Sequence, residues 1–164
     1  MRAGAALDLN SKSNRTTLMF AACYGHNEVA HELVRAGAAL DLQDRSGHTA
    51  LICATSKGHV AVVQELVRTG AKLDVQDNGK WTALMWAAYM GDLLVVQALV
   101  QAGAKLDLQD IFHRTALMWP ALNGRTEIVR TLVDAGAALD LQDNFHRTAL
   151  MTVSYTHLTL PTKA

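Results

Sequence analysis

Paired histidines are the residues of this sequence that most resemble a metal-binding set. His113 and His146 lie 33 residues apart, and imidazole nitrogens are common zinc ligands. Zinc holds its ligands at about 2 Å, whereas equivalent helices of stacked units lie about 10 Å apart. We therefore interpret both histidines as structural and predict no metal site.

A second pair of histidines has the same 33-residue spacing. His26 and His59 each precede an apolar stretch with helical periodicity. Histidine is a frequent acid–base catalyst, but a position at a helix start favours a capping role. We therefore interpret this pair as helix caps.

The two cysteines, Cys23 and Cys53, occupy different positions in the repeated pattern. Neighbouring helix axes about 8 to 10 Å apart are wide for a disulfide, although the geometry leaves one open. We expect two free thiols, buried or half-buried, and a reducing compartment.

One column of aspartates could form an acidic ladder for a cation. Its members are Asp8, Asp41, Asp74, Asp107 and Asp140. An aspartate in a turn more commonly bonds its own turn backbone, and we favour that role here. The sequence has no glycine-rich phosphate loop, activated nucleophile or cysteine cluster. We predict that the protein is not an enzyme and uses no cofactor.

Composition narrows the classes of partner. The chain has 164 residues, 50% of them apolar, with 15 basic and 15 acidic side chains. This balance argues against nucleic-acid binding, which needs a basic stripe. No stretch approaches the roughly 18 apolar residues of a membrane span, and no signal peptide opens the chain. We expect an intracellular, cytoplasmic monomer without direct membrane insertion.

Residues 69–101 form the unit that the rest of the chain repeats. Aligning the sequence with itself gives a step of 33 residues without insertions, marked by the column Gly4, Gly37, Gly70, Gly103 and Gly136. A fixed period of this length is typical of a stacked-repeat solenoid.

Each unit is predicted to contain two helices and a loop. Thr82 can cap a first helix that ends at Gly91, and a second helix begins near Asp92. Gly103 is expected to terminate this second helix. Residues 106–114 have turn residues and few apolar ones, which predicts an extended loop or hairpin finger. Neither helix can bury its apolar stripe alone, so the units must stack.

The columns resemble the ankyrin repeat, whose pattern is Asp-x-x-Gly-x-Thr-Pro-Leu-His-x-Ala-Ala-x-x-Gly-His. The best matching turn is Asp44-Arg45-Ser46-Gly47-His48-Thr49-Ala50-Leu51, followed by Gly58-His59. The resemblance implies an all-α solenoid of stacked antiparallel helix pairs, joined by extended loop or β-hairpin fingers. It also implies a non-enzymatic protein–protein interaction module. The Pro slot holds Thr or Ala, and the His slot holds Met or Ile.

We divide the chain into an array over residues 1–152 and a tail over residues 153–164. The repeats are 3–35, 36–68, 69–101, 102–134 and the partial unit 135–152. We expect the array to start in mid-repeat without an outer helix over the first finger, so that either it starts uncapped or an upstream part is missing. Lys80 occupies the glycine column, so we expect the third finger tip to rearrange. Pro120 falls inside a predicted helix and should kink or shorten it.

Residues 153–162, Val-Ser-Tyr-Thr-His-Leu-Thr-Leu-Pro-Thr, have no place in the repeat pattern. Their reverse translation resembles a transposon-end sequencing adapter read through in frame. The alternative is a divergent native end that folds over repeat four. We expect the tail to be poorly packed and exclude it from the functional argument.

What remains is a surface for a protein partner. The ankyrin resemblance implies that residues varying between repeats lie on the finger tips and first helices, along one concave side. The predicted partner-binding residues are Phe20, Tyr24, Arg45, His48, Trp81, Trp86, Tyr89, Phe112, Arg114 and Trp119. We expect Trp86 and Trp119 about 10 Å apart in adjacent helices. The alternatives are that the tryptophans only pad the helix layer, or that the chain is a regulatory or targeting fragment of a larger enzyme, channel or membrane-linked scaffold.

Overall fold

The protein is described by a computed structural model that covers residues 12–154, with side chains up to residue 151. These residues form the predicted all-α solenoid, and no strand occurs between residues 12 and 154. The helices are α1 (Thr17–Tyr24), α2 (Asn27–Arg35), α3 (Ala50–Ser56), α4 (Val60–Arg68), α5 (Ala83–Met90), α6 (Leu93–Gln101), α7 (Met118–Leu122), α8 (Thr126–Asp134) and α9 (Ala149–Ser154).

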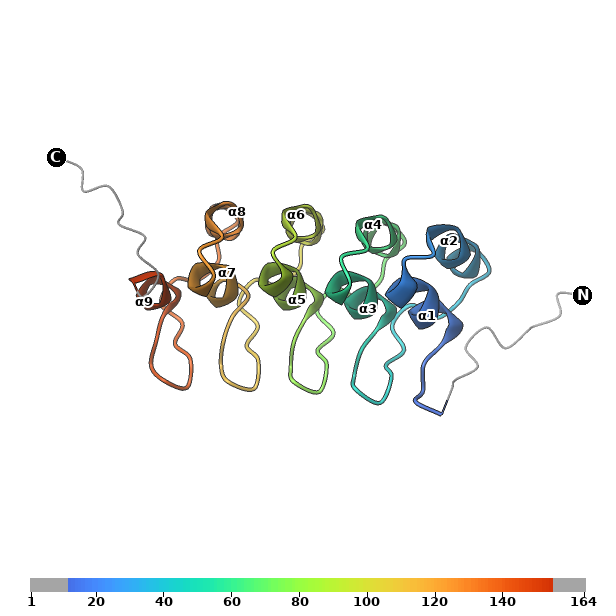
Figure 1. The fold of residues 1–164 in the computed structure, drawn as a ribbon, viewed down its shortest axis with the longest axis horizontal. Helices are drawn as coiled ribbons and strands as arrows, with labels where there is room; N and C mark the ends of the chain where they lie inside the picture. Colours follow the sequence, from blue (N-terminus) through green and yellow to red (C-terminus); the bar gives the residue numbers. More distant parts are fainter. Residues whose placement is uncertain (1–11, 155–164) are drawn as a thin grey trace, which may run out of the picture.

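The helices lie in two rows (Figure 1). The inner row contains α1, α3, α5, α7 and α9, and the outer row contains α2, α4, α6 and α8. Extended fingers leave the inner row on the side away from the outer helices, so each repeat has an L-shaped outline. The fingers and inner helices together form one side of the array, which we call the inner surface.

Repeat three shows why these residues form two helices. The Thr82 hydroxyl accepts a hydrogen bond from the Met85 amide at 3.3 Å and so caps α5. Gly91, at φ 81°, ends that helix. The Asp92 carboxylate then accepts from the Val95 amide at 3.2 Å and caps α6. Gly103, at φ 87°, follows the last turn of α6 as predicted.

The core is a set of columns that recur through the stack. Leu18, Leu51, Leu84 and Leu117 form one such column on the inner helices, and each is at most 2% exposed. The neighbouring side chains Met19, Ile52, Met85 and Met118, which replace the polar His of the ankyrin pattern, are also buried, whereas Met151 in the last unit is exposed. Burying one such side chain contributes roughly 1.5 to 3 kcal/mol, and the surface that buries it belongs partly to the next repeat.

The second to fifth fingers are each built on a buried aspartate. In repeat three, Asp77 Oδ1 accepts from the amides of Gly79 and Trp81 at 2.8 and 2.9 Å. Asp44, Asp110 and Asp143 make the equivalent bonds in their own fingers. Adjacent finger tips are also joined, because the Asn78 amide donates to the Ser46 carbonyl at 3.0 Å. The fingers therefore form one connected row.

The predicted rearrangement of the third finger tip was wrong. Lys80 adopts φ 58°, the left-handed conformation of the column, and its amide still bonds the Asp77 carbonyl at 2.8 Å. Asn14, His113 and His146 take the same conformation at φ 59° to 60°. The bonds to the aspartate outweigh the cost of left-handed backbone, about 1 to 2 kcal/mol for a residue with a Cβ.

This backbone cost gives a test. Lys80→Gly should raise the free energy of unfolding by about 1 kcal/mol, because glycine has no steric cost at this φ. Lys80→Ala is the matched control, since it removes the same exposed side chain and keeps the Cβ. Urea titration of both variants measures the effect. Equal stability of the Gly and Ala variants would contradict the assigned strain.

Three aspartates of the column that we assigned to its own turns link neighbouring repeats instead, and a fourth, Asp8, lies outside the described residues. Asp41, Asp74 and Asp107 each accept a hydrogen bond from an amide 31 residues further along, at 2.8 to 2.9 Å. The carboxylate reaches the following repeat because the stack brings that backbone alongside it. These aspartates therefore fix the register between neighbouring units.

The capping role predicted for His26 and His59 was also wrong. Both stand at helix starts, but neither side chain bonds its own helix. His59 Nε2 instead donates to the Cys23 carbonyl of the preceding repeat at 3.0 Å. Its ring lies directly over Gly25, where a Cβ would come within 2.5 Å of Nδ1. The histidine is a contact between repeats, and the glycine leaves room for it.

Repeat four has the shortened helix that Pro120 predicted. Its inner helix α7 spans five residues, whereas α5 spans eight. The Met118 amide bonds the Thr115 carbonyl at 3.2 Å, so the first turn is tightened. The Thr115 hydroxyl, whose equivalents cap α1, α3 and α5, is buried without a hydrogen-bond partner. Proline has no amide hydrogen and crowds the preceding turn, which accounts for the lost turn.

We expect Pro120→Ala to raise the melting temperature, because alanine restores the missing donor. The gain can approach about 3 kcal/mol, the usual cost of proline in a helix interior. Ala87→Pro makes the reverse change at the equivalent position of repeat three and should lower the melting temperature. Thermal unfolding followed by circular dichroism compares the two. A Pro120→Ala variant no more stable than the parent would contradict this account.

Two expectations fall outside the described residues. The missing outer helix before the first finger concerns residues 1–11, and the packing of the tail concerns residues 155–164. The boundary at residue 152 and the division into repeats remain predictions.

Candidate binding surface

Four aromatic side chains meet on the inner surface at repeats three and four. Trp81 comes from the third finger, Trp86 and Tyr89 from α5, and Trp119 from α7. The Trp81 ring lies between the other two indoles, with centroid distances of 4.8 Å to Trp86 and 4.6 Å to Trp119. Tyr89 meets Trp81 and Trp119 edge to face at 5.5 and 5.2 Å. We call these four residues the aromatic cluster.

The finger carboxylate of repeat three orients the cluster. Asp77 Oδ1 accepts from the Trp81 amide, while Oδ2 accepts from the Trp86 indole nitrogen at 3.0 Å. His48 lies beside both groups, with Nε2 3.6 Å from Asp77 Oδ2 and its ring 6.3 Å from Trp86. One buried carboxylate thus holds the finger and the first ring of α5 together.

At the other end of the cluster an arginine stacks on two rings. Arg114 Cζ lies 4.0 Å from the Trp119 centroid and 4.6 Å from the Phe112 centroid, distances typical of cation–π contacts. The guanidinium also donates to Asp110 Oδ2, with Nη2 at 2.9 Å. Because Arg114 occupies this carboxylate, the Trp119 indole N–H is buried without a partner. Repeats three and four therefore use the same aspartate position for different donors.

The four rings of the cluster differ in solvent exposure. Trp119 is only 8% exposed, so it mainly supports the other rings. Trp81 and Trp86 are half-buried, and Tyr89 is 42% exposed. The accessible aromatic surface is therefore formed by repeat three.

The predicted site residues do not all lie together. His48, Phe112 and Arg114 adjoin the aromatic cluster. Phe20 and Tyr24 are exposed on α1, two repeats away, where Tyr24 stacks with His26 at 6.1 Å. Arg45 is exposed on the second finger, and its carbonyl accepts from Asn78.

Sequence reasoning missed the aspartates under the rings and the position of Trp81 between two indoles. Asp77 and Asp110 recur at the 33-residue step, and that column was the available signal. Trp81 fills the space between the two helical tryptophans. Side-chain rotamers decide this arrangement, and residue spacing does not specify them.

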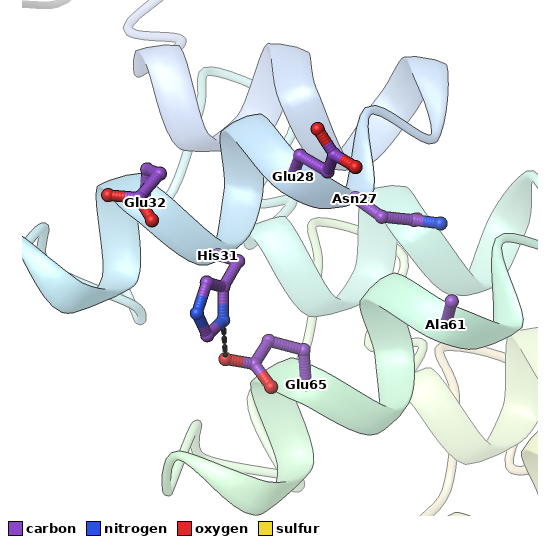
Figure 2. A pocket seen from close by; sticks show the side chains of 6 residues that line it. All are labelled: Asn27, Glu28, His31, Glu32, Ala61 and Glu65. Atoms are coloured by element: carbon purple, nitrogen blue, oxygen red, sulfur yellow. Dashed lines mark hydrogen bonds and ion pairs between the residues drawn. The ribbon is translucent and has the colours of Figure 1, made fainter.

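An open groove of about 410 Å³ lies between α2 and α4 on the opposite side (Figure 2). Figure 2 shows the His31 ring pointing across the groove to Glu65, with Nδ1 and Oε1 2.9 Å apart. The bond from His31, followed by that from Arg68, lowers the pKa of Glu65. Glu28 and Glu32 line the same groove. The contact joins two outer helices, and we assign it a structural role.

The buried thiol of Cys53 is held in an unreactive state. Burial, together with neighbouring Cys23, raises the pKa of Cys53 to about 12. This thiol stays protonated at neutral pH, and both cysteines are free.

Across residues 12–154, no three His, Cys, Asp or Glu side chains are grouped to hold a metal ion. In the same range, no helix has the length and apolar character needed to cross a membrane.

Comparison with known families agrees with this architecture. The model for ankyrin repeats (3 copies) matches residues 18–110 and 91–159. The chain belongs to the ankyrin repeat family, whose members are generally protein-interaction modules and typically not enzymes. No curated protein matches the chain.

The charged finger of repeat two gives a pH test. Burial opposes ionisation of Asp44, but the His48 amide, the Arg15 guanidinium and the Ser46 amide outweigh it and lower its pKa below the ordinary 3.8. The ionised group therefore contributes stability above pH 3.8, and this contribution is lost as pH falls through the lower folded-state pKa.

Asp44→Asn should lower the free energy of unfolding at pH 7 by about 1 to 2 kcal/mol, because asparagine keeps the acceptor but loses the charge. The difference from the parent should shrink below pH 3.8. Urea titrations between pH 2.5 and 7 measure it. Asp134→Asn, at an exposed position, is the control. A difference that stays constant over this range would contradict the assigned charge effect.

Proposed function

We propose that the chain binds a protein partner on the inner surface of repeats three and four, with the aromatic cluster at the centre of the contact. The observation that carries the proposal is the meeting of three tryptophans and one tyrosine, with Tyr89 42% exposed. Tryptophan and tyrosine dominate the binding energy of protein interfaces. Membership of a family that generally binds proteins supports the same function.

The surroundings of the cluster support an interface rather than padding alone. Arg114 and His48 lie at its two ends, and exposed Asn123 follows α7. An apolar centre with a polar rim is the usual composition of an interface. A role in packing the helix layer explains Trp119, which is 8% exposed. It does not explain Tyr89, whose ring is 42% exposed.

The proposed binding unit is a cytoplasmic monomer whose array spans residues 1–152. The balance of 15 basic and 15 acidic side chains and the two free thiols support this setting. The inner surface recognises its partner by shape and aromatic contact, without chemistry on the partner.

Two substitutions test the site. Trp86→Ala should weaken binding by about 2 kcal/mol, roughly 30-fold, as expected for an interface hot spot. Tyr89→Ala should also weaken binding, and it leaves the bond between Trp86 and Asp77 in place. A partner captured with the purified chain is identified first, and its dissociation constants are then measured by titration calorimetry.

Gln97→Ala, on outer helix α6, is the control and should change affinity very little. Circular dichroism must show matched folding for all variants, because the Trp86 indole also bonds a finger carboxylate. Unchanged affinity in both aromatic variants would place the partner elsewhere, on the finger tips or the outer helices.

A further inference from the structure

The residue before the threonine at the start of each inner helix often places a cation over an aromatic ring. This column holds Arg15, His48, Trp81, Arg114 and Arg147. Wherever it holds arginine, the guanidinium lies over a ring of the same repeat. The Cζ-to-centroid distances are 5.8 Å for Arg15 and Phe20, 4.0 Å for Arg114 and Trp119, and 4.9 Å for Arg147 and Phe145. All lie within the cation–π range of about 6 Å.

The same arginines neutralise the finger aspartates. Each donates to an Oδ2 atom, in the pairs Arg15–Asp44 at 3.1 Å, Arg114–Asp110 at 2.9 Å and Arg147–Asp143 at 2.7 Å. A cation on the inner surface is thus held by a ring face and by a carboxylate beneath it. The negative carboxylate and the negative face of the aromatic ring both favour a positively charged group.

Repeat three has the rings and the carboxylate but has lost the arginine. Trp81 replaces it and adds a ring to those of Trp86, Tyr89 and Trp119. Along residues 12–154, Asp77 is paired with no arginine; its Oδ2 accepts from the Trp86 indole and faces His48. In repeat three the enlarged aromatic surface therefore lies beside a finger aspartate that, among the described residues, is paired with no arginine.

We propose that the partner supplies this cation: an arginine or lysine side chain, methylated or not, projected from a peptide segment onto the accessible surface formed by Tyr89, Trp81 and Trp86. This inference rests on the proposed function and specifies the partner's chemistry at the same site. Aromatic faces carry negative potential, and Asp77 adds a negative charge beneath them. Guanidinium and methylated ammonium groups lose little hydration on binding, so they suit a site without a free surface carboxylate.

The protein reports directly on this site, because its three tryptophans are all members of the aromatic cluster. The probes are five-residue glycine-flanked peptides whose central residue is trimethyl-lysine, lysine, arginine or the neutral tert-butyl isostere of trimethyl-lysine. The isostere keeps the shape and removes the charge. Indole N–H signals of the isotope-labelled chain, followed by NMR titration, give the affinity of each peptide.

The trimethyl-lysine peptide should shift the Trp81 and Trp86 signals and bind about fivefold or more tightly than the neutral isostere, as expected for a cation–π contact. Tyr89→Leu should weaken that binding, and Tyr89→Phe should retain it. Phe145→Leu, on the fifth finger, is the matched control and should leave the affinity unchanged.

Trp81→Arg gives a second test, because it introduces the residue that the column holds in repeats one, four and five. The new guanidinium should occupy the site and abolish peptide binding in a folded chain. Circular dichroism and the remaining indole signals verify folding.

Equal affinity for the charged and neutral peptides would overturn the inference that the ligand is a cation. The site would then be an apolar docking site, and the proposed function would stand. Indole signals that none of the peptides shifts would also overturn it. Failure of the proposed function is recognised separately, by a partner whose affinity is unchanged in both Trp86→Ala and Tyr89→Ala.

Discussion

At the base of the second to fifth fingers, a buried aspartate accepts two backbone amides through one oxygen and a side-chain donor through the other. In repeat three the side-chain donor is the Trp86 indole, so the same carboxylate fixes the fold of the finger and the orientation of a surface ring. A buried carboxylate with several donors keeps its charge and holds its neighbours strongly. Asp77 fixes the geometry of the aromatic cluster, because Trp81 and Trp86 both donate hydrogen bonds to it.

The stack places the cluster between a regular repeat and a weakened one. Repeat three has capped helices of full length, whereas α7 has lost its first turn and its threonine cap. In a solenoid each repeat is stabilised mainly by its neighbours, so a local defect is tolerated when both sides are packed. Trp119, almost fully buried against Trp81, is one of the contacts that keep repeat four in place.

The period of the sequence predicted the helices, their order and most of the core, because burial at a fixed 33-residue step leaves little freedom. Threonine and glycine caps in repeat three and the shortened helix at Pro120 followed from local backbone chemistry. Contacts between repeats were harder to predict. His59 and Asp41 bond the neighbouring unit rather than their own, and this depends on which backbone the stack brings close.

The aromatic surface was predictable in composition but not in arrangement. Residue types and columns identified Trp81, Trp86, Tyr89 and Trp119, whereas the sandwiching of one indole between two others is a rotamer choice made by packing. Lys80 shows the opposite case. A residue with a poor intrinsic preference adopts the column's conformation because three hydrogen bonds to Asp77 require it.

The backbone bonds that join neighbouring finger tips have a consequence for length. Amides of Arg45, Asn78, Ile111 and Asn144 each donate to the preceding finger, so the tips are evenly spaced and cannot separate individually. Units about 10 Å apart match a polyproline II chain, which rises about 3.1 Å per residue with three residues per turn and so presents every third side chain on one face. The spacing of the fingers therefore matches a three-residue repeat in a bound peptide. A ligand whose anchoring side chains recur at that interval can engage successive repeats without bending.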